Sequence, residues 1–160
     1  NYLVSIQLPA VSDTGREVYG FRSNSNGGYD LTEMLTENSA NVELVCPENY
    51  TIYYGIRDNY PDSKYIGKLK NVVLSHGLET IGSSAFYRCS GVTEIKLPTT
   101  LETIENLAFY QCSALKEIKI PEGVKEIGSS AFEQCEGLRR VEIPETVVKF
   151  GGVCFQGART

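Results

Sequence analysis

Residues 115–137 read LKEIKIPEGVKEIGSSAFEQCEG. The same 23-residue pattern is written four times without insertion or deletion, in 69–91, 92–114, 115–137 and 138–160. Its clearest marker is a small residue followed by Phe, at Ala85-Phe86, Ala108-Phe109, Ala131-Phe132 and Cys154-Phe155. Self-similarity at a fixed period of this size is typical of a solenoid, in which each unit buries its apolar face against its neighbours.

The first half of the unit alternates between apolar and polar residues. In 115–120 the aliphatic residues are Leu115, Ile118 and Ile120. This spacing predicts one parallel strand per coil, with the aliphatic side chains inward and the residues between them outward. The proline that follows in three of the four units ends the strand and turns the chain.

The second half of the unit brings the chain back. We expect Gly128 to supply a bend that a side chain would hinder. Segment 129–135, SSAFEQC, is predicted to form one helical turn with a serine as its cap, which places Phe132 and Cys135 on one face.

Three of the five cysteines, Cys89, Cys112 and Cys135, occupy one position of the repeat. Adjacent coils stack about 4.8 Å apart with equivalent side chains parallel, whereas a disulfide needs converging Cβ atoms about 3.5–4.5 Å apart. We therefore predict buried free thiols, and no zinc site, because zinc ligands cluster as in C-x-x-C. Cys154 replaces the small Ala and is also predicted to be core, and Cys46 is left unexplained.

Residues 1–68 precede the regular array and are predicted to form an N-terminal cap or a small β-rich module. Segments 3–9 (LVSIQLP) and 42–47 (VELVCP) have the pattern of the unit's opening half, so degenerate coils are expected there. A short strand is expected within 18–21, and a helix of at most about two turns in 31–35.

Eight of the ten tyrosines lie in this leader. Tyr50, Tyr53 and Tyr54 form a β-prone cluster with two interpretations. Tyrosine clusters line glycan and peptide sites, because the ring stacks while the hydroxyl hydrogen-bonds, but a cap over the end of a solenoid also needs amphipathic aromatic residues. We favour the cap and keep the aromatic site as the alternative.

Composition narrows the function classes. The net charge is −5, so nucleic acid is not an expected partner, and the longest apolar runs are far shorter than the roughly 20 residues that span a bilayer. The single histidine, His76, falls in a turn, and none of the common catalytic or phosphate-binding motifs occurs. We expect neither an enzyme nor a cofactor or metal site.

The two ends of the chain suggest a fragment. The chain opens at Asn1 without Met, so we expect a mature form or a piece of a longer protein. The last unit drifts from the pattern and no polar capping segment follows Thr160. We expect a longer array, or another surface over this end, self-association included.

The pattern Leu-x-x-Ile-x-Leu-Pro followed by Leu-x-x-Ile-Gly-x-x-Ala-Phe-x-x-Cys resembles the BspA-like, or Treponema-type, leucine-rich repeats over residues 69–160. The Asn ladder of the common leucine-rich repeat is absent, because its positions hold Gly77, Thr100, Gly123 and Thr146. The resemblance implies a right-handed α/β-type solenoid, mostly strand and loop, with a parallel sheet on its concave face. It also implies a bacterial or protist protein, secreted or at the cell surface, that adheres to host proteins or other cells without catalysis.

The outward positions of the predicted strands form three columns across the coils. These are Lys70, Thr93, Lys116 and Arg139; Asn71, Glu94, Glu117 and Arg140; and Val73, Lys96, Lys119 and Glu142. Acidic and basic side chains are expected to face each other there. Mixed charge keeps an exposed sheet soluble, which is the favoured interpretation of any single residue.

Two function hypotheses follow. In the first, the whole concave face binds a protein or a cell-surface glycan. In the second, the solenoid is a spacer and the tyrosine-rich leader binds glycan or peptide.

Overall fold

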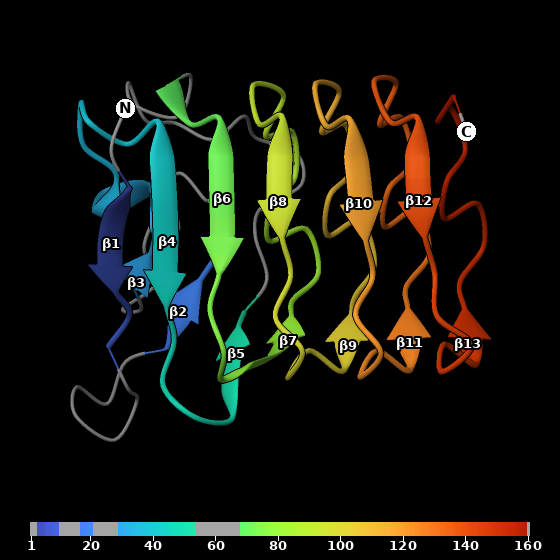
Figure 1. Cartoon of the computed structure of the whole chain (residues 1–160), viewed down its shortest axis with the longest axis horizontal. Coiled ribbons are helices and arrows are strands. Elements are labelled where there is room, and N and C mark those ends of the chain that lie inside the picture. The colour runs from blue at the N-terminus through green and yellow to red at the C-terminus, as the bar shows by residue number, and fades with distance from the viewer. Residues whose placement is uncertain (1–2, 10–16, 21–28, 54–67, 160) are drawn as a thin grey trace.

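A computed structural model of the chain describes residues 3–9, 17–20, 29–53 and 68–159 and confirms the solenoid (Figure 1). Its coils stack side by side, and the two ends of the chain lie at opposite ends of the stack. Two parallel sheets run along this axis. Each coil therefore contacts only the coil before it and the coil after it, as expected for a repeat array.

The first sheet has six strands. In spatial order they are β1 (Val4–Gln7), β4 (Asn41–Val45), β6 (Asn71–Leu74), β8 (Glu94–Lys96), β10 (Glu117–Lys119) and β12 (Arg140–Glu142). Val72 pairs with Ile95, and Ile118 with Val141, so the register of the regular coils is the 23-residue repeat itself. Val72, Ile95 and Ile118 are buried, which confirms the predicted alternation.

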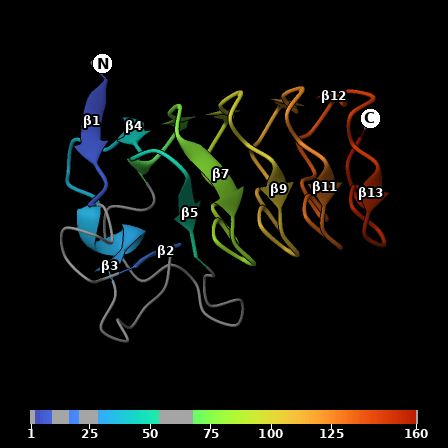
Figure 2. The same cartoon turned by 90° about the horizontal axis from the view of Figure 1, so that it is seen from below.

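The second sheet has five strands and is brought into view in Figure 2. Its strands are β5 (Tyr50–Ile52), β7 (Leu78–Ile81), β9 (Thr103–Ile104), β11 (Glu126–Ile127) and β13 (Lys149–Phe150). The prediction of one strand per coil was wrong, because the returning half of each coil is also a strand. In β7 the buried residues are Leu78 and Ile81, three apart, and this spacing escapes a search for strict alternation.

The leader takes part in both sheets. Segments 3–9 and 42–47, where degenerate coils were expected, contain β1 and β4, and β4 pairs with β6 from Asn41↔Asn71 to Leu44↔Leu74. The first sheet thus continues across residue 68 without a break. A separate pair joins β2 (Val18–Tyr19) to β3 (Tyr29–Asp30), and a 3₁₀ helix, η1, runs Leu31–Met34. Both the short strand and the short helix were predicted; Phe21 lies outside the described residues.

A column of stacked phenylalanines fills the interior. Phe86, Phe109 and Phe132 are almost fully buried, and successive rings from Phe86 to Phe155 lie 5.1–5.2 Å apart and nearly parallel. The alanine before each of the three buried phenylalanines is also buried. Because each interior ring has two ring neighbours, stability rises with each added coil.

The cysteine ladder confirms the predicted thiols. All five cysteines are free and buried. The Sγ of Cys112 donates to the carbonyl oxygen of Phe86 at 3.3 Å, and that of Cys135 to the carbonyl of Phe109 at 3.2 Å, so each thiol satisfies a backbone group of the preceding coil. Burial raises the pKa of the Cys135 thiol to about 12.

The segment around Ala-Phe is not the predicted helical turn. Ser130 and Gln134 have φ angles of 57° and 58°, in the left-handed region, so the segment consists of separate turns, closed by the amides of Ala131 and Glu133, and not of a helical turn. The serine does not cap its own turn either. Instead the backbone amide of Ser129 donates to Oδ1 of Asn106 in the preceding coil at 2.8 Å, and its Oγ accepts from the amide of Gly152 in the next coil, so this serine bonds to both neighbouring coils.

A side chain at Gly128 is excluded by the neighbouring coil and not by a bend in the chain. A Cβ added there would lie 2.4 Å from the backbone nitrogen of Asn106, so the glycine permits close approach of the preceding coil.

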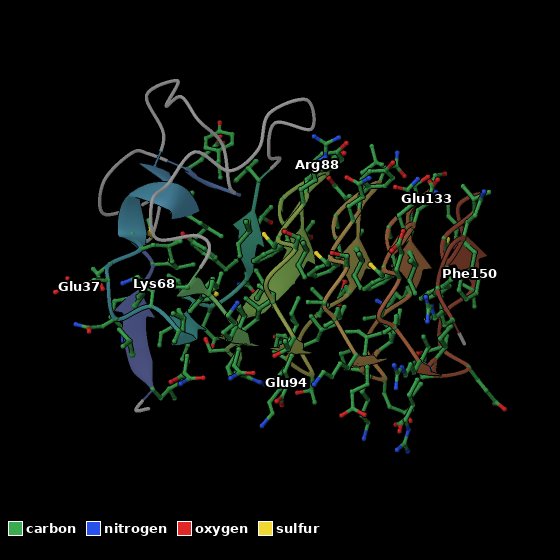
Figure 3. All side chains as sticks on the ribbon, turned by 90° about the horizontal axis from the view of Figure 1, so that it is seen from above. Glu37, Lys68, Arg88, Glu94, Glu133 and Phe150 are labelled. Atoms are coloured by element: carbon green, nitrogen blue, oxygen red, sulfur yellow. The ribbon has the colours of Figure 1, made fainter. Side chains whose placement is uncertain are left out.

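The last coil exposes apolar side chains. Val148 is 82% exposed, Val153 54% and Phe150 50%. Phe150 is labelled at the far end of the array in Figure 3. Self-association at this end, which the sequence left open, stays a prediction.

Candidate partner-binding surface

A shallow groove of about 570 Å³ lies on the outward face of the first sheet, over β8, β10 and β12. Six of its lining residues were predicted from the sequence: Glu94, Lys96, Glu117, Lys119, Arg140 and Glu142. Glu94, labelled in Figure 3, points away from the coil interior on this side, while Arg88 and Glu133 lie on the opposite side. The groove is therefore a feature of one face, at the C-terminal half of the array.

The strand register sets the predicted columns side by side. Asn71 pairs with Glu94, Glu94 with Glu117, and Glu117 with Arg140. In the next outward column Val73 pairs with Lys96, and Lys119 with Glu142. The third column lies just before the strands, where the backbone amides of Thr93, Lys116 and Arg139 each donate to the carbonyl of the coil before.

Exposure differs along the face. In the last three coils the predicted charged residues are exposed, whereas Asn71 and Val73 in β6 are half-buried. The Asn71 amide donates to Oδ1 of Asn41, so this part of the face satisfies its own polar groups. The exposed charged side chains of this face are therefore concentrated where the groove lies.

The signs of these charges correct one expectation. Acid does not face base throughout, because Glu94 lies directly beside Glu117. Continuing the same register by two residues sets Lys96 beside Lys119. Only the last coil reverses the order, with Arg140 beside Glu117 and Glu142 beside Lys119. Side chains of like charge in adjacent strands repel, so this order costs stability.

Ion pairs on this face form within a strand. Nζ of Lys96 lies 3.8 Å from a carboxylate oxygen of Glu94, and a guanidinium nitrogen of Arg140 lies 2.7 Å from Glu142. Among the described residues, Glu117 and Lys119 form no ion pair. The centre of the groove therefore presents one acid and one base, two residues apart, that are both open to a ligand.

The rim of the groove includes residues that sequence reasoning missed. Leu97, Thr99, Pro121 and Glu122 follow the strands and line it as well. Their signal was the proline turn, since a turn at the same place in each coil builds an edge along the array. Thr99 and Glu122 are exposed, and Pro121 is buried beneath them.

The alternative aromatic site has a different character. Tyr50 is 6% exposed in β5, and its hydroxyl donates to the carbonyl of Pro9 at 2.8 Å. Tyr53 is half-buried, with its ring 5.5 Å from that of Tyr19, and Tyr54 lies outside the described residues. The burial of Tyr50 favours a packing role for this ring over contact with a ligand.

Other kinds of site find little support. Within the described ranges, no three His, Cys, Asp or Glu side chains gather as a metal ion would require. None of the helices in the same ranges has the length and apolar character needed to cross a bilayer.

Comparison with known proteins agrees with the repeat geometry. A family model described as BspA type leucine rich repeat region matches residues 64–160 with six copies. The chain is similar to a leucine-rich repeat protein from Bacteroides ovatus ATCC 8483, with TM-score 0.65 and 25% identity over 96% of this chain. It is also similar to a leucine rich cell surface protein from Faecalibacterium prausnitzii A2-165, with TM-score 0.63 and 26% identity over 96% of this chain.

A third similar structure is the leucine rich repeat protein of T. pallidum, with TM-score 0.55 and 29% identity over 66% of this chain. The chain spans 34%, 39% and 53% of the Bacteroides, Faecalibacterium and T. pallidum proteins, respectively. No curated protein matches it. The relatives are leucine-rich repeat proteins, a non-enzymatic kind of family, and no enzymatic activity is indicated.

Proposed function

We propose that the chain, which belongs to the BspA-type leucine-rich repeat family, is an adhesion module. In this proposal it binds a protein or glycan partner through the outward face of its first sheet. The observation that carries the proposal is the groove over β8, β10 and β12, because it gathers exposed, incompletely paired charges on one face. Charges that are not satisfied within the protein are available to a partner, and they contribute to specificity and to the rate of association.

The location proposed for this activity is a cell surface or the extracellular space. The support is that the similar Faecalibacterium protein is described as a leucine rich cell surface protein. A solenoid suits such a role, since stacked coils present an extended face that a compact domain of the same size lacks.

The experiment compares equal charge changes on the two sheets. One variant carries Lys96→Glu and Lys119→Glu in the groove; its matched control carries Lys125→Glu and Lys149→Glu on the second sheet. Wild type and both variants are screened against arrays of cell-surface glycans and extracellular proteins, with circular dichroism to show that each is folded. All four lysines are exposed, so each substitution should change stability by less than about 1 kcal/mol.

The groove variant should lose partner binding by tenfold or more, roughly, because like charges across an interface cost several kcal/mol. The control should bind as wild type does. If the groove variant keeps its binding, or both variants lose it equally, the first sheet is not the binding face. A broader variant that reverses Lys96, Lys116, Lys119 and Arg139 together extends the test to the third column.

A further inference from the structure

The charge order in the groove points to a ligand geometry. Glu94 and Glu117 form one acidic strip across β8 and β10, and Lys96 and Lys119 form a basic strip beside it. Within each strand the acid and the base are two residues apart, a separation of about 6.6 Å along a strand. The two strips lie side by side at a fixed spacing.

From this order we propose that the groove binds an extended peptide segment in which a basic and an acidic side chain are separated by one residue. The inference rests on the proposed function and assigns it a class of partner. In an extended peptide, side chains two residues apart point to the same side and are also about 6.6 Å apart. Laid between β8 and β10, such a peptide sets its base between the two glutamates and its acid between the two lysines.

Each charge of the peptide would then meet two opposite charges of the protein. Before binding, Glu94 repels Glu117 and Lys96 repels Lys119, and strands in a sheet are only about 4.8 Å apart. A ligand charge inserted in each strip relieves that repulsion, whereas a neutral ligand leaves it in place. The existing pair of Lys96 with Glu94, at 3.8 Å and with both side chains more than half exposed, offers little resistance.

The last coil restricts the ligand to one register. Between β10 and β12 a peptide base would meet Glu117 together with Arg140, and a peptide acid would meet Lys119 together with Glu142. These opposed charges cancel. On the other side, β6 offers only Asn71 and Val73 on this face. The part of the groove between β8 and β10 is therefore the place on the described face where both charges of the acidic strip are negative and both charges of the basic strip are positive.

The test uses three short peptides of identical composition, each with one Lys and one Glu in a Ser/Thr background. Lys and Glu are separated by one residue in the first peptide, adjacent in the second and separated by two residues in the third. In the second and third peptides the two charges point to opposite sides of an extended chain. Because single contacts between exposed charges are weak, the peptides are displayed at equal density on beads.

Wild type should be retained about fivefold more by the first peptide than by the other two. Lys119→Glu should abolish this preference, while Lys125→Glu on the second sheet should preserve it. Equal retention on the three peptides would overturn the inference, and so would a preference that survives Lys119→Glu. If the peptide test fails in either way while the array screen still places binding on the groove, or if the screen identifies a glycan there, the proposed function stands and the peptide assignment alone falls.

Discussion

The two sheets of the solenoid place their ion pairs differently. On the second sheet, ion pairs join neighbouring coils: Lys125 lies 3.5 Å from Glu102, and Lys149 2.9 Å from Glu126. On the first sheet, ion pairs stay within one strand, and Glu94 lies beside Glu117 of the next coil. One repeat unit thus carries one face with ion pairs between coils and another with ion pairs inside a strand.

Solubility alone does not explain the charge order of the first sheet. Opposite signs in adjacent coils would have kept the face equally soluble and would have added attraction between coils, as Lys125 and Glu102 do, although Glu79 and Glu102 also lie side by side. The array tolerates the less stable order because its stability comes from the interior, which lies behind both faces.

The largest effect is expected in the interior. Phe109→Ala should lower the free energy of unfolding by about 3–5 kcal/mol, because the ring is fully buried and stacks on Phe86 and Phe132. Phe155→Ala should cost clearly less, since that ring is partly exposed and is stacked only on Phe132 among the described residues. Denaturant titration of both variants measures the difference. Equal losses would contradict stacking of nearest neighbours and leave the stability of the array unexplained.

Alkaline pH should weaken the same interior. Burial raises the pKa of Cys135 from 9.0 to about 12, so the folded protein keeps a proton that the unfolded chain has already released. This contribution to stability is complete below about pH 9 and is lost as pH rises from 9 toward 12. The melting temperature should fall less steeply for Cys135→Ala than for wild type as pH rises across this range. Tyrosine titration is unchanged in the variant, so the difference between the two proteins reports the thiol.

Thiol reactivity offers a second readout of that prediction. A thiol reagent at pH 8 should modify the cysteines of the native protein slowly and those of the unfolded protein at once. Fast modification of the native protein would show that the ladder is open to solvent.

Much of the fold could be predicted from the sequence because the repeat supplies its own register. A spacing of 23 residues without gaps fixes which side chains lie side by side. It therefore predicts that Cys89, Cys112 and Cys135 form one buried ladder, as the structure shows. The second sheet was missed because its buried residues are three apart, as in Leu78 and Ile81. The helical turn at 129–135 was wrong because Ser130 and Gln134 adopt left-handed φ angles, which divide the segment into separate turns.

The candidate site was harder to predict in one respect. Sequence alone identified the outward columns, but it did not show that a groove lies over the last three coils, or that the turn residues Thr99 and Glu122 line its rim. The lining of the groove combines residues of three coils, so the groove is a property of stacked coils rather than of a single unit.

The smallest effect is also the most direct test of the contrast between the sheets. Two double-mutant cycles at low salt measure the coupling between Glu94 and Glu117, each changed to Gln, and the coupling between Glu102 and Lys125, each changed to Gln. The first coupling should be unfavourable and the second favourable, each by less than about 1 kcal/mol. A favourable or absent coupling between Glu94 and Glu117 would contradict the claim that the first sheet keeps its charges for a partner at a cost in stability.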